Sequence, residues 1–257
     1  MMDLSALDLS ILGPALIAGL LVLATHVPLG IQVLDRGIVF IDLAIAQIAG
    51  LGVIAADLMG WEPQGLAVQV AAISAALAGA VLLSFSERRV GKNQEALIGV
   101  LFVLAACAGL LLLASNPHGG EHLKDLLVGQ ILWVNGVQIG WLAGLSVLIL
   151  ALWYGLARRL GRFGFYAVFA VAVTASVQLV GVYLVFSSLI IPALATRALS
   201  GKRRLLGAWA LGGIAYAAGL ALSALFDLPS GAVLVWVLAL AGLGVALWAA
   251  PQAEAPV

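Results

Sequence analysis

Three polar side chains near the start of the chain lie in or beside apolar stretches and could ligate a metal ion. Asp42 is the only acid well inside such a stretch, and His26 lies in the preceding one. Two antiparallel helices joined near residues 34–37 would bring these two to similar depth, because each helical residue rises about 1.5 Å. Gln47 follows roughly one turn further along. Imidazole and carboxylate suit zinc or manganese, and an amide oxygen is a weaker ligand. The alternative is an interhelical hydrogen bond that locks the two helices together.

A second polar group lies in the predicted external loop, residues 116–125. Its members His118, Glu121, His122 and Asp125 fall within eight residues. In a helical segment, the two acids or the two histidines would share a face at i,i+4 spacing. Such a cluster could form the outer entrance for a divalent cation, although a metal site needs three or four converging donors. A solvated loop is the other interpretation.

The elements that position these residues must be membrane spans. Of the 257 residues 64% are apolar, only 24 are charged (12 Lys+Arg and 12 Asp+Glu), and the mean hydropathy is +1.17. Soluble domains carry about 25% charged residues. The composition therefore excludes a soluble enzyme and a nucleic-acid-binding protein, which would need a basic surface. The single cysteine, Cys107, allows no disulfide within the chain.

The apolar stretches are long enough for helices and lack the alternation of barrel strands. We therefore predict an all-α, polytopic membrane helical bundle with about eight or nine transmembrane helices, forming a single transmembrane domain over residues 1–257. The predicted spans are 10–33, 38–58, 66–85, 96–115, 137–157, 164–183, 184–200, 206–226 and 230–249.

Basic residues predict the orientation. Eleven of the twelve Lys and Arg fall in or beside the first, third, fifth and seventh turns between successive predicted spans. Only Lys124 falls in an even-numbered turn, the fourth. The positive-inside rule then places the N-terminus outside and the odd turns in the cytoplasm.

Residues 163–200 leave the helix count open. Charge parity requires this stretch to cross twice, and Gly181, Ser187 and Ser188 are the candidates for its turn. Pro192 interrupts the second crossing. Short, Gly- or Pro-interrupted spans often line a pathway, but an ordinary kinked helix hairpin fits as well.

Four blocks in order resemble the membrane permeases of metal-chelate-type (zinc, manganese or iron) ABC importers. The resemblance covers residues 15–245. The blocks are PLG at 28–30 with Leu34 and Arg36, LIG at 97–99 with LLVGQIL at 126–132, VGVYL at 180–184 with LIIPALATR at 189–197, and FDLPSGA at 226–232.

The resemblance implies the permease subunit of an ABC importer for divalent metal, zinc or manganese, in the bacterial inner (plasma) membrane. It implies a transport subunit and not an enzyme, because the chain lacks the Walker A pattern and ATP hydrolysis would fall to a separate subunit. The implied partners are a cytoplasmic ATP-binding subunit, an extracytoplasmic metal-binding protein and a second copy of the chain. Metal would be substrate, with no permanently bound cofactor. The alternative function is a stand-alone ion-coupled secondary transporter or channel for a small cation.

Two departures from the family pattern bear on mechanism. The family commonly has an Asp and a His four residues apart in the second span, where this chain has Leu43 and Gln47. The acid has moved to Asp42, so whether it replaces the usual metal dyad is open. The cytoplasmic stretch 157–164 is also short, so ATPase docking would use another loop, such as residues 86–95 or 200–205, or would follow a different arrangement from that of the family.

Overall fold

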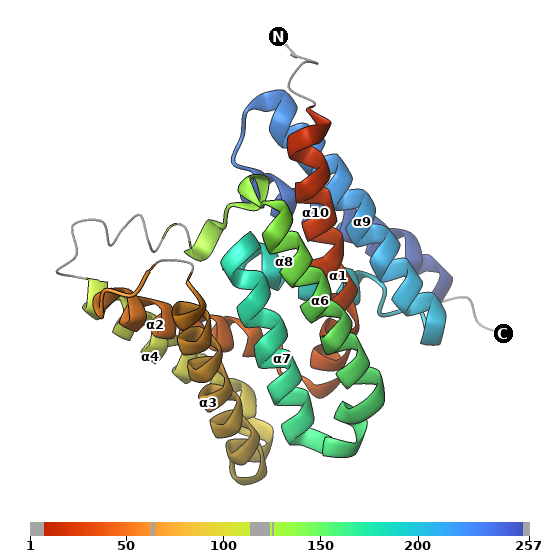
Figure 1. Cartoon of the computed structure of the whole chain (residues 1–257). Helices are drawn as coiled ribbons and strands as arrows, with labels where there is room; N and C mark the ends of the chain where they lie inside the picture. The colour runs from red at the N-terminus through yellow and green to blue at the C-terminus, as the bar shows by residue number, and fades with distance from the viewer. Residues whose placement is uncertain (1–7, 63–64, 114–123, 125, 254–257) are drawn as a thin grey trace. The chain divides into compact units, whose positions relative to one another are not determined.

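The computed structural model describes residues 8–62, 65–113, 124 and 126–253, and its secondary structure there is helical throughout (Figure 1). The long helices in chain order are α1 (Leu9–Arg36), α2 (Ile41–Leu58), α3 (Leu66–Val90), α4 (Gln94–Leu113), α6 (Gly136–Leu152), α7 (Arg158–Val180), α8 (Val182–Ala195), α9 (Gly201–Phe226) and α10 (Ser230–Ala253). Three short helical segments are η2 (Gly91–Asn93), η3 (Ile131–Trp133) and the π-helical η4 (Trp153–Ala157).

The described helices confirm the predicted fold class. Eight of them are long and apolar enough to cross a membrane, and α8 is a shorter apolar helix. These nine correspond in order to the nine predicted spans. The largest shift is at α7, which begins at Arg158, six residues before the predicted start of that span, and α6 ends at Leu152, five residues before its predicted end. The segment η4 fills these five positions and leads directly into α7.

The chain forms two compact units, each described here by itself. Unit 1 comprises Met1–Asp35, Val128–Ser146 and Leu179–Val257, and unit 2 comprises Arg36–Leu127 and Val147–Gln178. Each unit is assembled from segments distant in sequence. The prediction of one permease domain over residues 1–257 is untested by this division and stays a prediction.

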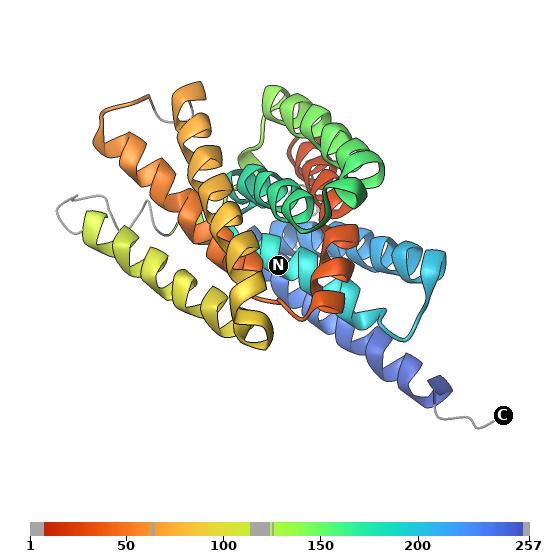
Figure 2. The same cartoon turned by 90° about the horizontal axis from the view of Figure 1, so that it is seen from below.

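In unit 2, α2, α3 and α4 lie side by side in both views (Figures 1 and 2). Small residues allow the close approach. A Cβ at Gly52 would lie only 2.7 Å from the Ala71 carbonyl oxygen, and one at Gly109 would lie 3.4 Å from Ile54 Cδ1. Helices associate in lipid largely through such small-residue contacts, because lipid tails provide no hydrophobic driving force between helices.

In unit 1, α10 packs against both α8 and α9. The buried Tyr216 on α9 lies against Gly19 of α1, where any side chain would collide with its ring. Its hydroxyl hydrogen-bonds Ser188 Oγ on α8 at 2.8 Å, and Ser188 Oγ also donates to the Leu184 carbonyl at 2.6 Å. This chain of bonds satisfies two polar groups inside an otherwise apolar helix contact.

Two left-handed glycines form a close backbone contact in unit 1. Gly129 has φ +70° and Gly181 has φ +81°, and a Cβ on either would collide with the other segment's backbone. The Gln130 N–H donates to the Leu179 carbonyl at 3.3 Å beside this contact. Gly181 is the break between α7 and α8, so the candidate Gly181, and not Ser187 or Ser188, interrupts the 163–200 stretch.

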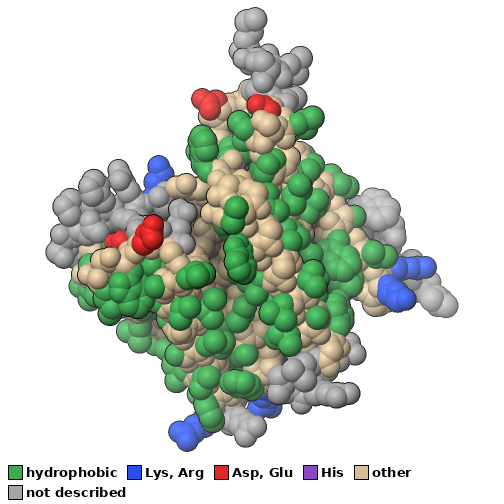
Figure 3. Space-filling view, viewed as in Figure 1, with side chains coloured by type: hydrophobic (Ala, Val, Ile, Leu, Met, Phe, Trp, Pro, Cys, Tyr) green, Lys and Arg blue, Asp and Glu red, His purple; other side chains and the backbone are tan. Residues whose placement is uncertain are grey.

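The outward faces of many helices are apolar. Leu111 is 77% exposed, Trp141 73% and Trp236 69%. In Figure 3, apolar side chains spread over the visible helix surfaces, and the charged groups gather near helix ends. Exposed apolar surface on this scale suits lipid rather than water.

Candidate translocation-path residues

His26 presents a buried nitrogen lone pair. The residue lies in α1 within unit 1 and is fully buried, and its Nδ1 contacts the Val22 carbonyl at 2.9 Å and Thr25 Oγ1 at 3.0 Å. A carbonyl can only accept, so Nδ1 carries the proton and Nε2 carries the lone pair. Nε2 is buried without a hydrogen-bond partner. Metal-binding histidines commonly donate their other N–H to a backbone carbonyl in this way.

Asp42 lies in the first turn of α2 within unit 2 and is only 2% exposed. Its Oδ1 has no hydrogen-bond partner, although the side chain is almost completely withdrawn from solvent. A buried, incompletely paired carboxylate is costly, so it requires a proton, a cation or another function.

Gln47 lies on the same helix and is partly buried. Five residues along a regular helix turn the side chain by about 140°, so Asp42 and Gln47 do not share a helix face. Their convergence on one ligand depends on side-chain reach. His26 belongs to the other unit, and the meeting of all three residues stays a prediction.

The four residues of the predicted outer entrance, His118, Glu121, His122 and Asp125, lie outside the described residues. Within the part of the chain that is described, no group of three or more His, Cys, Asp or Glu side chains is placed to hold a metal. A complete protein-only metal site is therefore absent from the described segments.

Glu95 is a polar residue that sequence reasoning missed. It lies in the first turn of α4, and its Oε1 accepts the backbone N–H of Phe40, the N-cap residue of α2, at 3.1 Å. Its Oε2 is buried without a partner. The sequence does show an acid next to Gln94 at the very start of an apolar run. Sequence reasoning assigned this position to the loop 86–95.

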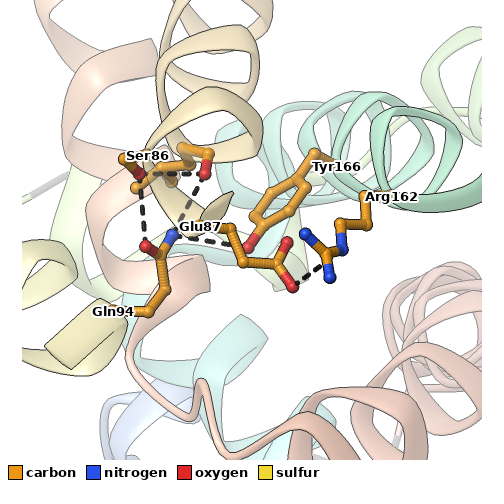
Figure 4. A network of polar contacts seen from close by, with 6 residues as sticks. Ser86, Glu87, Gln94, Arg162 and Tyr166 are labelled. Atoms are coloured by element: carbon orange, nitrogen blue, oxygen red, sulfur yellow. Dashed lines mark hydrogen bonds and ion pairs between the residues drawn. The ribbon is translucent and has the colours of Figure 1, made fainter. Parts of the chain in front are cut away.

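A polar network ties the ends of α3, α4 and α7 together (Figure 4). Gln94 Nε2 donates to the Leu83 carbonyl at 3.1 Å and lies 3.5 Å from the Tyr166 hydroxyl, and Ser86 Oγ donates to Gln94 Oε1 at 3.2 Å. Glu87 Oε1 pairs with Arg162 Nε at 3.4 Å. This network fixes the helix ends where unit 2 carries its basic residues.

Arg36 stabilises the same end of unit 2. Its guanidinium carbon lies 4.2 Å from the centre of the Phe165 ring, within the range of a cation–π contact. Phe165 in turn packs edge-on against Trp153 and Tyr166, with ring centres 6.0 and 5.4 Å away. The arginine of the first sequence block is therefore held by an aromatic cluster next to η4.

The sequence matches the ABC 3 transport family over residues 8–161 and 150–249, which is nearly all of the chain. The chain belongs to the ABC 3 transport family. This ABC 3 permease is 24% identical over 252 residues to the manganese transport system membrane protein MntC of Halalkalibacterium halodurans, covering 90% of this chain and 85% of that protein. It is 27% identical over 254 residues to the protein of Thermotoga maritima named "Probable metal transport system membrane protein", covering 89% of this chain and 86% of that one.

The fold of the ABC 3 permease is also found in a solved structure. The structure titled "PsaBC from Streptococcus pneumoniae in complex with Fab" matches with a TM-score of 0.73 at 20% identity, covering 91% of this chain and 90% of that chain. This match confirms the polytopic helical fold, and the family match confirms the suspected family.

The blocks that carried the family resemblance contact one another in unit 1. Gly30 lies against the Leu189 carbonyl, Gly129 against Gly181, and a Cβ at Gly231 would lie 2.6 Å from the Val128 carbonyl oxygen. Each block therefore supplies a glycine or a backbone surface that another block requires. The four sequence blocks therefore contain residues that backbone packing requires. This explains why the family resemblance is visible in a chain without a catalytic motif.

Proposed function

We propose that this ABC 3 permease is the membrane subunit of an importer for divalent metal ions, zinc or manganese, and that it forms the translocation path. The observation that carries the proposal is the family match together with the two buried, unpartnered ligand atoms His26 Nε2 and Asp42 Oδ1. Relatives of similar length are named for manganese or metal transport. Lone-pair nitrogen and carboxylate oxygen are the donors that such ions take.

His26, Asp42 and Gln47 would line the path, and His118, Glu121, His122 and Asp125 would form its outer entrance. Asp42 lies in the first turn of α2, six residues after Arg36 in the turn that is predicted to be cytoplasmic. It would therefore meet the ion near the cytoplasmic end of the path. The role of the chain is alternating access to these donors. ATP hydrolysis belongs to a separate subunit.

The partners in this proposal are a cytoplasmic ATP-binding subunit, an extracytoplasmic metal-binding protein and a second copy of the chain, in the bacterial inner membrane. The ATP-binding subunit would dock on a basic cytoplasmic segment, at 86–95 or 200–205. The short π-helical η4 and the sharp break at Gly161 (φ +60°) shape the neighbouring turn.

The test is metal uptake in cells that depend on this chain. Radioactive manganese or zinc accumulation should fall to background with Asp42→Ala at normal expression, while Asp57→Ala at the other end of α2 should leave it unchanged. Unchanged uptake with Asp42→Ala would remove Asp42 from the mechanism. Uptake by the purified chain in liposomes without ATP or another subunit would favour the stand-alone transporter instead.

A further inference from the structure

The first turns of α2 and α4 bring two carboxylates to one place in unit 2. Glu95, in the first turn of α4, accepts the backbone N–H of Phe40 at 3.1 Å. Asp42 is two residues beyond Phe40, in the first turn of α2. The hydrogen bond to Phe40 therefore holds Glu95 at the start of α2, where Asp42 also lies.

Each of these carboxylates keeps one oxygen buried and unpartnered, Asp42 Oδ1 and Glu95 Oε2. Asp42 is only 2% exposed. The ion pairs formed among the described residues, Arg162–Glu87 and Arg204–Asp35, involve neither of them. Asp42 is thus withdrawn from water and Glu95 is partly buried, and among the side chains that the structure describes no basic group forms an ion pair with either acid.

Helix N-termini compensate only part of this charge. A helix N-terminus carries about half a positive charge, and both acids lie in a first turn. Two full negative charges side by side still repel, and burial makes an uncompensated charge costly. A doubly charged cation between the free oxygens would neutralise both acids at once.

The donors indicate which cation fits. Both are carboxylates, and the described residues supply no third His, Cys, Asp or Glu to complete a cluster. The remaining ligands would be water or backbone carbonyl. Oxygen-only coordination suits Mn²⁺ and other hard divalent ions, whereas zinc sites draw on imidazole and thiolate.

We propose that Asp42 and Glu95 together hold a hard divalent cation, with Mn²⁺ as the transported ion, at the end of unit 2 where α2 and α4 begin. The inference rests on the proposed function, because it treats the bound ion as the cargo and assigns its chemical class. It adds Glu95 as a ligand and makes the site all-oxygen. A cargo ion would occupy this site on its way to the cytoplasm.

The experiment measures Mn²⁺ binding to the purified full-length chain by electron paramagnetic resonance. Bound Mn²⁺ loses the sharp six-line signal of the free ion, so a titration gives both the number of sites and their affinity. Asp42→Asn and Glu95→Gln keep side-chain volume and remove one charge each. Asp57→Asn is the matched control, because it makes the same change at the opposite end of α2.

We expect Asp42→Asn and Glu95→Gln each to weaken one Mn²⁺ site at least tenfold, and Asp57→Asn to leave it unchanged. Electron spin echo measurements on the bound ion should show water protons and no directly coordinated nitrogen. The proposal is overturned if both variants bind Mn²⁺ like the parent chain, if the parent binds none at millimolar Mn²⁺, or if a coordinated nitrogen appears.

Uptake in cells separates this proposal from the function on which it rests. Chain-dependent manganese uptake that survives Glu95→Gln, with parental Mn²⁺ binding, overturns the site and leaves the importer standing. Absence of any chain-dependent metal uptake, with Mn²⁺ still bound through Asp42 and Glu95, overturns the importer and leaves the site.

Discussion

The tautomer of His26, one of the residues proposed to line the path, is set by a backbone carbonyl of its own helix. The Val22 carbonyl holds the proton of His26 on Nδ1 and so directs the lone pair of Nε2 into the protein interior. Thr25 Oγ1 donates to the same carbonyl at 3.0 Å. One turn of α1 therefore fixes both the tautomer and the orientation of the imidazole, with no help from a distant side chain.

This arrangement predicts the behaviour of two substitutions at His26. In His26→Asn the side-chain N–H can still reach the Val22 carbonyl, but the lone pair at the Nε2 position is lost. We expect metal uptake to fall by about tenfold or more, on the scale of disturbed metal coordination. His26→Gln places its amide group nearer to the Nε2 position and should retain more uptake than His26→Asn. The measurement is radioactive metal accumulation at matched membrane expression, and equal uptake by His26→Asn and the parent would exclude a ligand role.

Elements in unit 1 are joined where glycines let two backbones meet. The contact of Gly129 with Gly181 combines positive φ at both residues with an approach that leaves no room for a side chain. The segment before η3 is thereby fixed to the start of α8. The break between α7 and α8 is held by tertiary contact and not by a local turn sequence alone.

Alanine substitution tests this junction. Gly181→Ala should destabilise the purified protein by about 1–3 kcal/mol from backbone conformation alone, with the collision against Val128 adding to it. The control is Gly144→Ala in α6, where a Cβ meets nothing within 4 Å, and it should be neutral or slightly stabilising. Thermal unfolding in detergent checks both variants. A Gly181→Ala protein as stable as the parent would contradict the described contact.

The sequence predicted these elements better than it predicted the site. Long apolar runs and the need to satisfy every backbone hydrogen bond in lipid leave helices as the solution, so the order of the spans and their number to within one follow from the apolar runs. Gly181 was one of three candidates, because only a few residues in the 163–200 stretch could break a helix. Glu95 was missed, since its role arises from a hydrogen bond across 55 positions to Phe40, which no local pattern reveals.

At the scale of the whole molecule, the placement of basic residues along the chain predicts the orientation in the membrane. Eleven of the twelve Lys and Arg lie in or beside the turns that are predicted to be cytoplasmic, and only Lys124 lies in a turn that is predicted to be external. The Asp42–Glu95 pair lies at the start of α2 and α4, beside the basic α3–α4 turn. With the predicted orientation, the proposed cargo site would lie at the end from which an ion leaves toward the cytoplasm.

Cysteine labelling tests the proposed orientation. In a Cys107→Ala background, the exposed positions Asp8 and Lys202 are each changed to cysteine, as Asp8→Cys and Lys202→Cys. With the N-terminus outside, an impermeant maleimide should label the first variant in intact cells and the second only after permeabilisation. The reverse pattern would invert the topology and move Asp42 to the external end of the path. The cysteine-free chain is the control for background labelling.

The shortness of α8 has an electrical consequence. Its 14 residues rise about 21 Å, against about 30 Å for the hydrocarbon core of a bilayer. The helix alone therefore cannot separate the two aqueous sides over the full thickness of the membrane. If solution reaches one of its ends, the membrane voltage falls over a shorter distance there. A divalent ion passing that section would gain or lose about 4.6 kcal/mol per 100 mV within it, twice the value for a single charge. Measuring how uptake varies with membrane potential would show whether the cargo crosses the field at this thinner section.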